Sequence, residues 1–336
     1  MTSVDVGARR VLHCCYSCSD ADGAGAVFAG VGLRERMRTD ESLRPGTLLG
    51  LDKMVRSMAT FLYDERGPRT SPAIEVQHWV DPPAFGVPYE TPQEVGLHAV
   101  GFVVLDAEAG AARLAELGCT VIGRVPGDAG VFDAAAVVLR DPRGVTIDLV
   151  DGPVAADSAG QLGSLRITCS DIERSLSWYR EMGFAIIAPA ARVKLAGAAF
   201  GLAEPSVELD VARLRLPDEP TQIVLCQWIS PASVGRHYDR ANHLGLYRVA
   251  VAVDDTRAAY AAACAAGWTF HSPPINRTIE GTNVPAMWIA ITRDPDNIAF
   301  EFVERPRSAF RPSSDSKPSD SKPDHSKEEH RGQPGN

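Results

Sequence analysis

The feature that most constrains the fold of this chain is an internal repeat with an offset of about 150 residues. Residues of comparable position recur at this spacing in four places. The pairs are Trp79 and Trp228, His98 and Tyr247, Asp148 and Glu301, and His13 and Ser164, with offsets of 149, 149, 153 and 151 residues. A near-constant offset indicates that the chain is a duplicated half.

Each half divides again into two modules, and residues 162–188 show the pattern of one module most clearly. Their sequence is LGSLRITCSDIERSLSWYREMGFAIIA. Polar and apolar residues alternate up to Ser170, which predicts a strand. Asp171 stands where a helix N-cap belongs, and Gly183 stands where the helix would end. The residues from Phe184 onward are typical of a second strand.

The same order of strand, helix, glycine and strand recurs along the chain, with modules beginning near residues 11, 96, 162 and 245. Asp141-Pro142 and Asp294-Pro295, followed by Gly144 and Asn297, predict matching hairpin turns near the module ends. We therefore expect an α+β fold of four βαβββ modules. The predicted parts are two domains over residues 10–152 and 163–305, a linker over 153–162 and a disordered tail over 306–336.

Composition restricts the partners and the compartment. The net charge of -9 disfavours nucleic acid and anionic membranes as partners. The N-terminal residues have no apolar signal core, and no apolar run is long enough to span a bilayer. The seven cysteines are an odd number at irregular spacing, which predicts a reduced, cytoplasmic protein. Cys14 and Cys15 point to opposite faces of the predicted strand, so we expect no cysteine metal site there.

The four modules, together with closing strands such as IEVQHW and DPRGVTIDLV, resemble the vicinal oxygen chelate superfamily. That superfamily includes glyoxalase I, bleomycin-resistance proteins and extradiol dioxygenases. The resemblance covers roughly residues 10 to 305. It implies that paired modules form a curved sheet around a cleft. In enzymes of the family, this cleft holds a divalent metal bound by residues of the first and last strands of the modules.

The resemblance places the metal ligands of the first half at four positions: His13, Glu75, His98 and Asp148. Two imidazoles and two carboxylates suit one divalent ion, for which Fe, Zn, Mn and Ni are the candidates. Asp148 is shorter than the usual glutamate, so a set of two histidines and Glu75 is the smaller alternative. Glu75 is also a candidate catalytic base.

The second half departs from this pattern. Its corresponding residues are Ser164, Val224, Tyr247 and Glu301, which predict no metal site. Arg166, Tyr247 and Glu301 are expected on one side of its sheet. They are the candidate catalytic residues of a metal-free reaction or a site for an anionic ligand. An ordinary salt-bridged sheet face is the alternative interpretation.

Three functional hypotheses follow. The first is a metal-dependent lyase, isomerase or dioxygenase acting on a small oxygenated substrate; the resemblance adds bacterial natural-product metabolism as a setting. The second is a metal-free protein that sequesters a small molecule, as bleomycin-resistance proteins do. The third is a metal-free acid–base enzyme that uses the second half. A monomer and a homodimer are equally compatible with two fused halves.

Overall fold

The computed structural model describes residues 6–155 and 158–305, and these contain the predicted strand and helix order in all four modules. The predicted tail over residues 306–336 lies outside the described residues. Module one consists of β1 (Arg10–Cys18), α1 (Ala21–Gly30), β2 (Arg34–Arg38), β3 (Ser42–Pro45), η1 (Thr47–Leu49), β4 (Met54–Tyr63) and β5 (Ala73–Asp81). Module two consists of β6 (Gly96–Val104), α2 (Ala107–Glu116), β7 (Thr120–Val125), β8 (Ala136–Arg140) and β9 (Thr146–Asp151).

Modules three and four repeat this order, so the predicted α+β class is confirmed. Module three consists of β10 (Gln161–Thr168), α3 (Ile172–Met182), β11 (Ala185–Leu195), η2 (Gly197–Phe200), β12 (Val207–Arg215) and β13 (Gln222–Ser230). Module four consists of β14 (Gly245–Val253), α4 (Thr256–Ala265), β15 (Ile275–Arg277), β16 (Met287–Arg293) and β17 (Ala299–Glu304).

The local signals in the sequence act as expected. Asp171 caps α3 by accepting a hydrogen bond from the backbone N–H of Arg174, and Asp20, Asp106 and Asp255 cap the other three α-helices in the same way. Gly183 ends α3 at φ 118°, a left-handed conformation that favours glycine. These caps fix the start of each helix directly after the first strand of its module.

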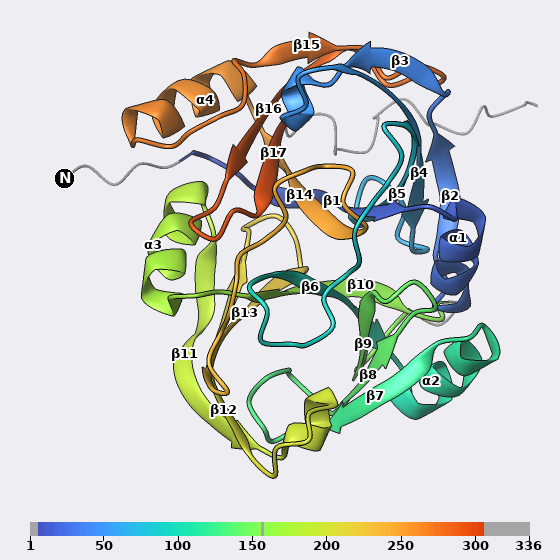
Figure 1. Cartoon of the computed structure of the whole chain (residues 1–336), viewed down its shortest axis with the longest axis vertical. Coiled ribbons are helices and arrows are strands. Elements are labelled where there is room, and N and C mark those ends of the chain that lie inside the picture. The colour runs from blue at the N-terminus through green and yellow to red at the C-terminus, as the bar shows by residue number, and fades with distance from the viewer. Residues whose placement is uncertain (1–5, 156–157, 306–336) are drawn as a thin grey trace, which may run out of the picture.

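The strands of the described residues form two curved sheets (Figure 1), and modules do not pair in chain order. In the first sheet, β1 lies antiparallel to β14, so modules one and four are joined. In the second, β10 lies antiparallel to β6, so modules two and three are joined. We call these the terminal sheet and the central sheet. The pairing of neighbouring modules expected for residues 10–152 and 163–305 is therefore not the pairing seen in the sheets.

The connections between modules are short within a sheet and longer between the two sheets. The short connection 152–160, which overlaps the linker predicted over 153–162, joins two strands of the same central sheet. The longer connections 82–95 and 231–244 each pass between the two sheets, and they lie against each other through bridges at Phe85 with His243 and Glu94 with Val234. We call these two segments the crossovers.

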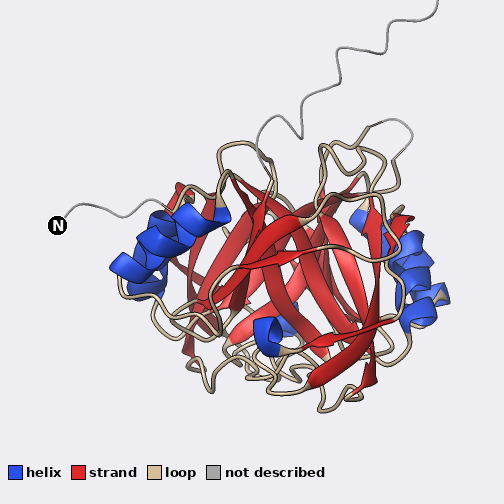
Figure 2. Cartoon of the chain, turned by 90° about the horizontal axis from the view of Figure 1, so that it is seen from above, coloured by secondary structure: helices blue, strands red, loops and turns tan. Residues whose placement is uncertain are grey.

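A continuous apolar core joins helices and sheets. Ile172, Leu176 and Tyr179, predicted at helical spacing, are buried on the inner face of α3. Their cluster extends to β1, β6, β10 and β14 and therefore includes both sheets. Figure 2 shows the helices on the outer flanks, with the strands between them. In the described part of the chain, no helix is long and apolar enough to cross a membrane.

Candidate functional site

The terminal sheet brings together four ionisable side chains from four strands. His13 lies on β1, Glu75 on β5, Arg248 on β14 and Glu301 on β17. The parallel pairing of β5 with β1, and of β17 with β14, sets the two glutamates on either side of the central antiparallel pair. Modules one and four therefore share one site, although its residues lie up to 288 positions apart along the chain (301 − 13).

The guanidinium of Arg248 lies between the two glutamates. Its Nε donates to Glu301 Oε2 at 2.6 Å, and its Nη2 donates to Glu75 Oε1 and Oε2 at 2.9 and 2.7 Å. The side chains of Arg248, Glu75 and Glu301 are only 7%, 5% and 8% exposed. Charge-assisted hydrogen bonds of this length, shielded from water, hold the three groups in one network.

Electrostatics within this network keep its members charged. Burial of Arg248 disfavours its cation, but the neighbouring Cys15, Glu75 and Glu301 outweigh that effect and raise its pKa. For Glu301, burial disfavours the carboxylate and acts to raise the pKa. Attraction to Arg248 and contact with His13 outweigh this effect and lower the pKa to about 2. At neutral pH the Arg248 guanidinium and the Glu301 carboxylate are therefore both charged.

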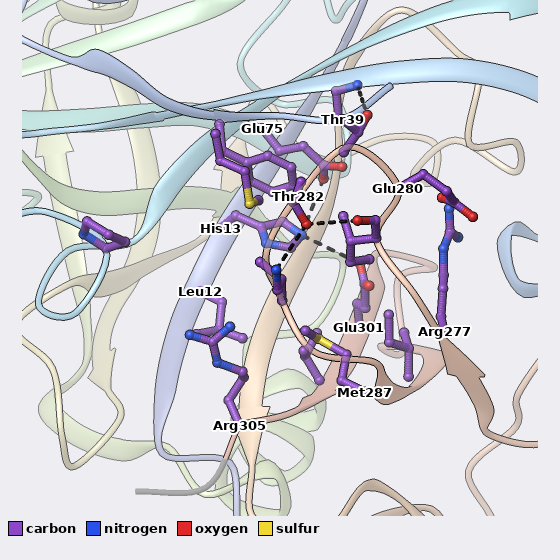
Figure 3. Close-up of a pocket in the computed structure, with 18 of the residues that line it drawn as sticks. Leu12, His13, Thr39, Glu75, Arg277, Glu280, Thr282, Met287, Glu301 and Arg305 are labelled. Atoms are coloured by element: carbon purple, nitrogen blue, oxygen red, sulfur yellow. Dashed lines mark hydrogen bonds and ion pairs between the residues drawn. The ribbon is translucent and has the colours of Figure 1, made fainter. Parts of the chain in front are cut away.

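His13 completes the group. Its Nε2 lies 3.3 Å from Glu75 Oε2 and 3.6 Å from Glu301 Oε2, and its ring packs edge-on against Phe61 with centroids 5.4 Å apart. In the part of the chain that the structure describes, this Nε2 is buried and makes no hydrogen bond of good geometry. Figure 3 shows His13 beside Glu75 and Glu301 in the cleft.

A pocket of about 1170 Å³ opens over these residues. Its walls come from both modules, and Figure 3 shows Leu12, Met287, Thr282 and Arg277 around His13, Glu75 and Glu301. Apolar side chains make up much of the lining: Leu12, Leu48, Leu49, Phe61, Met287 and Ile289. Since ligand pockets in proteins are usually a few hundred to about 1000 Å³, this space accommodates an organic molecule.

The donor set does not fit a divalent metal. Within residues 6–155 and 158–305, no group of three or more His, Cys, Asp or Glu side chains is arranged to hold a metal ion. Both carboxylate oxygens of Glu75 and the Oε2 atom of Glu301 already accept hydrogen bonds from Arg248. A guanidinium cannot lose its charge at physiological pH, so it competes with a metal ion for these oxygens.

The predicted ligand set of His13, Glu75, His98 and Asp148 is divided between the two sheets, so these four residues do not form one site. Asp148 lies in the central sheet, where Arg166 Nε and Nη2 donate to its two oxygens at 2.8 and 3.0 Å. Both side chains are almost fully buried. The prediction placed modules one and two around one cleft, and the observed module pairing separates them.

His98 lies on β6 at a β-bulge, where the pairing with β10 passes from Ala99 opposite Arg166 to Leu97 opposite Ile167. The register of β6 with β9 sets Gly101, rather than His98, beside Asp148. The His98 ring stacks on Tyr89 with centroids 4.5 Å apart, and its Nε2 contacts the Glu94 carbonyl oxygen. Burial, aided by Arg166, lowers its pKa to about 3.

The second predicted group, Arg166, Tyr247 and Glu301, is also not assembled. Tyr247 lies beside Arg248 at a β-bulge of β14, packs near His237 and accepts a hydrogen bond from Arg293 Nη2 at 3.0 Å. Arg166 belongs to the central sheet, whose corresponding face is filled by an apolar cluster that contains Phe200, Val224 and Trp228. Of the three, Glu301 alone lines the pocket described above.

Sequence reasoning missed Arg248, which decides the chemistry of the cleft. A signal was present: the strand GLYRVAVAVDD carries one charged residue inside an otherwise apolar run. Alignment by the repeat directed attention to Tyr247, one position earlier, because that residue corresponds to His98. A β-bulge in β14 at Tyr247 and Arg248 interrupts the alternation there, so spacing alone did not show that Arg248 enters the cleft.

Comparison with known proteins confirms the resemblance inferred from the sequence. The family model described as the Glyoxalase/Bleomycin resistance protein/Dioxygenase superfamily matches residues 161–302. Glyoxalase I from Zea mays has a similar structure, with a TM-score of 0.60, 17% identity, and coverage of 90% of this chain and 94% of that chain. A candidate dioxygenase from Bacillus subtilis subsp. subtilis str. 168 has a TM-score of 0.60 and 16% identity, with coverage of 88% and 85%. No curated protein matches this sequence.

Proposed function

We propose that the terminal-sheet cleft binds a small organic molecule without a metal ion. The chain carries the fold of the vicinal oxygen chelate superfamily and matches its family model over residues 161–302. The observation that supports the proposal is Arg248, whose guanidinium lies between Glu75 and Glu301. In this proposal the positive charge at the centre of the cleft is part of the polypeptide.

The metal-dependent hypothesis required His13, Glu75, His98 and Asp148 around one ion, and those residues lie in two different sheets. The sequestering hypothesis requires only a pocket of suitable size with polar groups at one end. The cleft has both: apolar walls, and the cluster of His13, Glu75, Arg248 and Glu301. The geometry therefore favours the second hypothesis over the first.

The catalytic roles predicted for Glu75 and Glu301 stay predictions within this proposal. Both carboxylates are held by Arg248, and Glu301, with its pKa near 2, is a poor acceptor of protons at neutral pH. His13 Nε2 is the better placed group for proton transfer, because it is buried beside the pocket and makes no hydrogen bond of good geometry within the described residues.

The test is metal binding to the wild type and to Arg248→His. Isothermal titration with Zn²⁺ and Ni²⁺ on chelator-treated full-length protein is expected to show no specific site in the wild type. Arg248→His replaces the guanidinium with an imidazole beside His13, Glu75 and Glu301, so we expect this variant to bind one equivalent of metal that the wild type does not bind.

The matched control is Arg192→His, which makes the same substitution on β11, far along the chain from the cleft residues. We expect no metal site in this variant. One equivalent of tightly bound metal in the wild type as purified, lost on His13→Ala together with Glu75→Ala, would contradict the metal-free proposal.

A further inference from the structure

Two further arginines face the cleft from opposite ends of the terminal sheet. Arg44 lies on β3 in module one, and Arg277 lies on β15 in module four. Figure 1 shows β3 and β15 close together at the top of the molecule. The backbone N–H of Asp40 donates to the carbonyl oxygen of Glu280 at 3.2 Å, so the two ends of the curved sheet meet beside the pocket.

Neither guanidinium has a carboxylate partner in the part of the chain that the structure describes. Arg44 donates to Ser42 Oγ, Ser57 O and Ser57 Oγ at 3.2, 3.3 and 2.6 Å. Within the described residues, the guanidinium of Arg277 makes no hydrogen bond and no ion pair. Other arginines of the pocket lining are paired: Arg36 with Glu65, and Arg38 with Glu35.

Both positions are unfavourable for an unpaired cation. Burial, together with the nearby charge of Arg277, lowers the pKa of Arg44 to about 10. Burial also lowers the pKa of Arg277, against the attraction of Glu301 and the exposed Glu280. Arg44, with its pKa of about 10, remains charged at neutral pH, and a guanidinium in general keeps its charge there.

Charge within the cleft does not balance. Four glutamates line the pocket, Glu75, Glu280, Glu301 and Glu304, and the first and third already bond to Arg248. The arginines of the lining outnumber them: Arg36, Arg38, Arg44, Arg69, Arg248, Arg277 and Arg305. A buried or half-buried charge costs free energy unless a counter-charge approaches it. A negatively charged ligand group between Arg44 and Arg277 supplies that counter-charge.

We propose that the ligand of this cleft is an organic anion, with its carboxylate, sulfonate or phosphate bound by Arg44 and Arg277 and its apolar or aromatic body against Leu48, Leu49, Met287 and Ile289. This inference rests on the proposed function and specifies its ligand class. Guanidinium groups bind such anions through paired N–H donors, which gives orientation as well as affinity.

The experiment compares two fluorescent probes on the full chain: 8-anilinonaphthalene-1-sulfonate and the neutral N-phenyl-1-naphthylamine, which has the same rings without the sulfonate. We expect the wild type to bind the sulfonate more tightly. The double variant Arg44→Gln, Arg277→Gln is expected to bind the sulfonate at least tenfold more weakly and the neutral probe within twofold of the wild type.

Two controls make the result specific. Arg44→Lys with Arg277→Lys keeps the charges and is expected to restore part of the sulfonate affinity. Arg36→Gln removes an arginine of the pocket rim that is already paired with Glu65, and is expected to change that affinity by less than twofold. Rising NaCl concentration should weaken binding of the sulfonate alone.

Failure of the inference and failure of the proposed function have different signatures. Sulfonate affinity that is unchanged in the double glutamine variant would overturn the anion inference while leaving a binding cleft. Ala59→Trp fills the cleft from β4, where Ala59 is buried and lines the pocket. If neither probe binds the wild type, or if both bind Ala59→Trp as tightly, the proposed function itself is wrong.

Discussion

Arg248 forms one buried ion-pair network with Glu75 and Glu301, and at the scale of single residues this network sets the chemistry of the cleft. Removing one member of such a network leaves the others charged and desolvated, which costs more than the pairing itself contributes. The contrast with exposed pairs is large: Arg192 and Asp210 bond at 2.6 Å, but the arginine side chain is half exposed and water screens the interaction.

We expect Arg248→Met to lower the free energy of unfolding by about 3–5 kcal/mol, because two buried carboxylates lose their partner. Arg192→Met, the matched control on the surface, should change it by less than about 1 kcal/mol. Urea unfolding at pH 7, followed by far-ultraviolet circular dichroism, measures both. Equal effects of the two substitutions would show that the network is not the stabilising element.

The same network predicts a pH dependence. The folded pKa of Glu301, about 2, lies below its unfolded value of about 4.5, so its contribution is present above pH 4.5 and is lost as the pH falls toward 2. In Arg248→Met this loss on acidification should disappear, because burial without the guanidinium raises the carboxylate pKa. The variant is therefore expected to lose less stability than the wild type between pH 4.5 and 2.

At the scale of elements, the two crossovers are held together by neutral histidines. His237 Nδ1 accepts from the Tyr89 hydroxyl at 2.7 Å, and its Nε2 donates to the Tyr247 carbonyl oxygen at 2.8 Å. His98 stacks on the same Tyr89 from β6. Burial lowers the pKa values of His98 and His237 to about 3, so each stays neutral while the fold is intact.

These histidines should destabilise the fold on acidification. Their pKa of about 3 in the folded state lies below the unfolded value of 6.5. At pH values between 3 and 6.5, the unfolded chain therefore binds more protons than the folded chain. Stability is complete above pH 6.5 and falls toward pH 3 by about 1.4 kcal/mol per pH unit for each histidine. His237→Gln keeps a hydrogen-bond acceptor and a donor. Between pH 6 and pH 4, it should reduce the dependence of the unfolding free energy on pH by the contribution of about one proton. An unchanged slope in urea titrations would refute this assignment.

At the scale of the whole molecule, each half of the chain contributes one module to each sheet. The fragment 6–155 holds β1 and β6, whose antiparallel partners β14 and β10 lie in the other half. The fragment 96–230 instead contains every strand of the central sheet. When a central strand of a sheet lacks its neighbouring strand, it exposes unpaired backbone groups and apolar surface.

We therefore expect the fragment 96–230 to unfold cooperatively in urea, at lower stability than the full chain because part of the shared core is lost. The fragment 6–155 should show no cooperative transition as a monomer. Circular dichroism and size-exclusion chromatography on both fragments test this. Cooperative folding of monomeric 6–155 would favour the predicted domains over the observed pairing.

By itself, the sequence determined every local feature of the modules. The aspartate caps, the turns at Gly144 and Asn297 and the alternation of the strands depend on residues a few positions apart, so their chemistry can be read from the chain. The repeat offset then sufficed for the family resemblance, and it placed His13, Glu75 and Glu301 on strands.

Only the tertiary structure decided which modules share a sheet and which residues share a cleft. The four modules have similar edges, so local pattern allows module one to pair with module two or with module four. The core common to both sheets and the crossovers select the second arrangement. That choice unites His13 and Glu75 with Glu301, leaves His98 and Asp148 in the other sheet, and brings Arg248 between the two glutamates. Long-range pairing of nearly equivalent strands depends on the packing of the whole chain, and no short stretch of sequence encodes it.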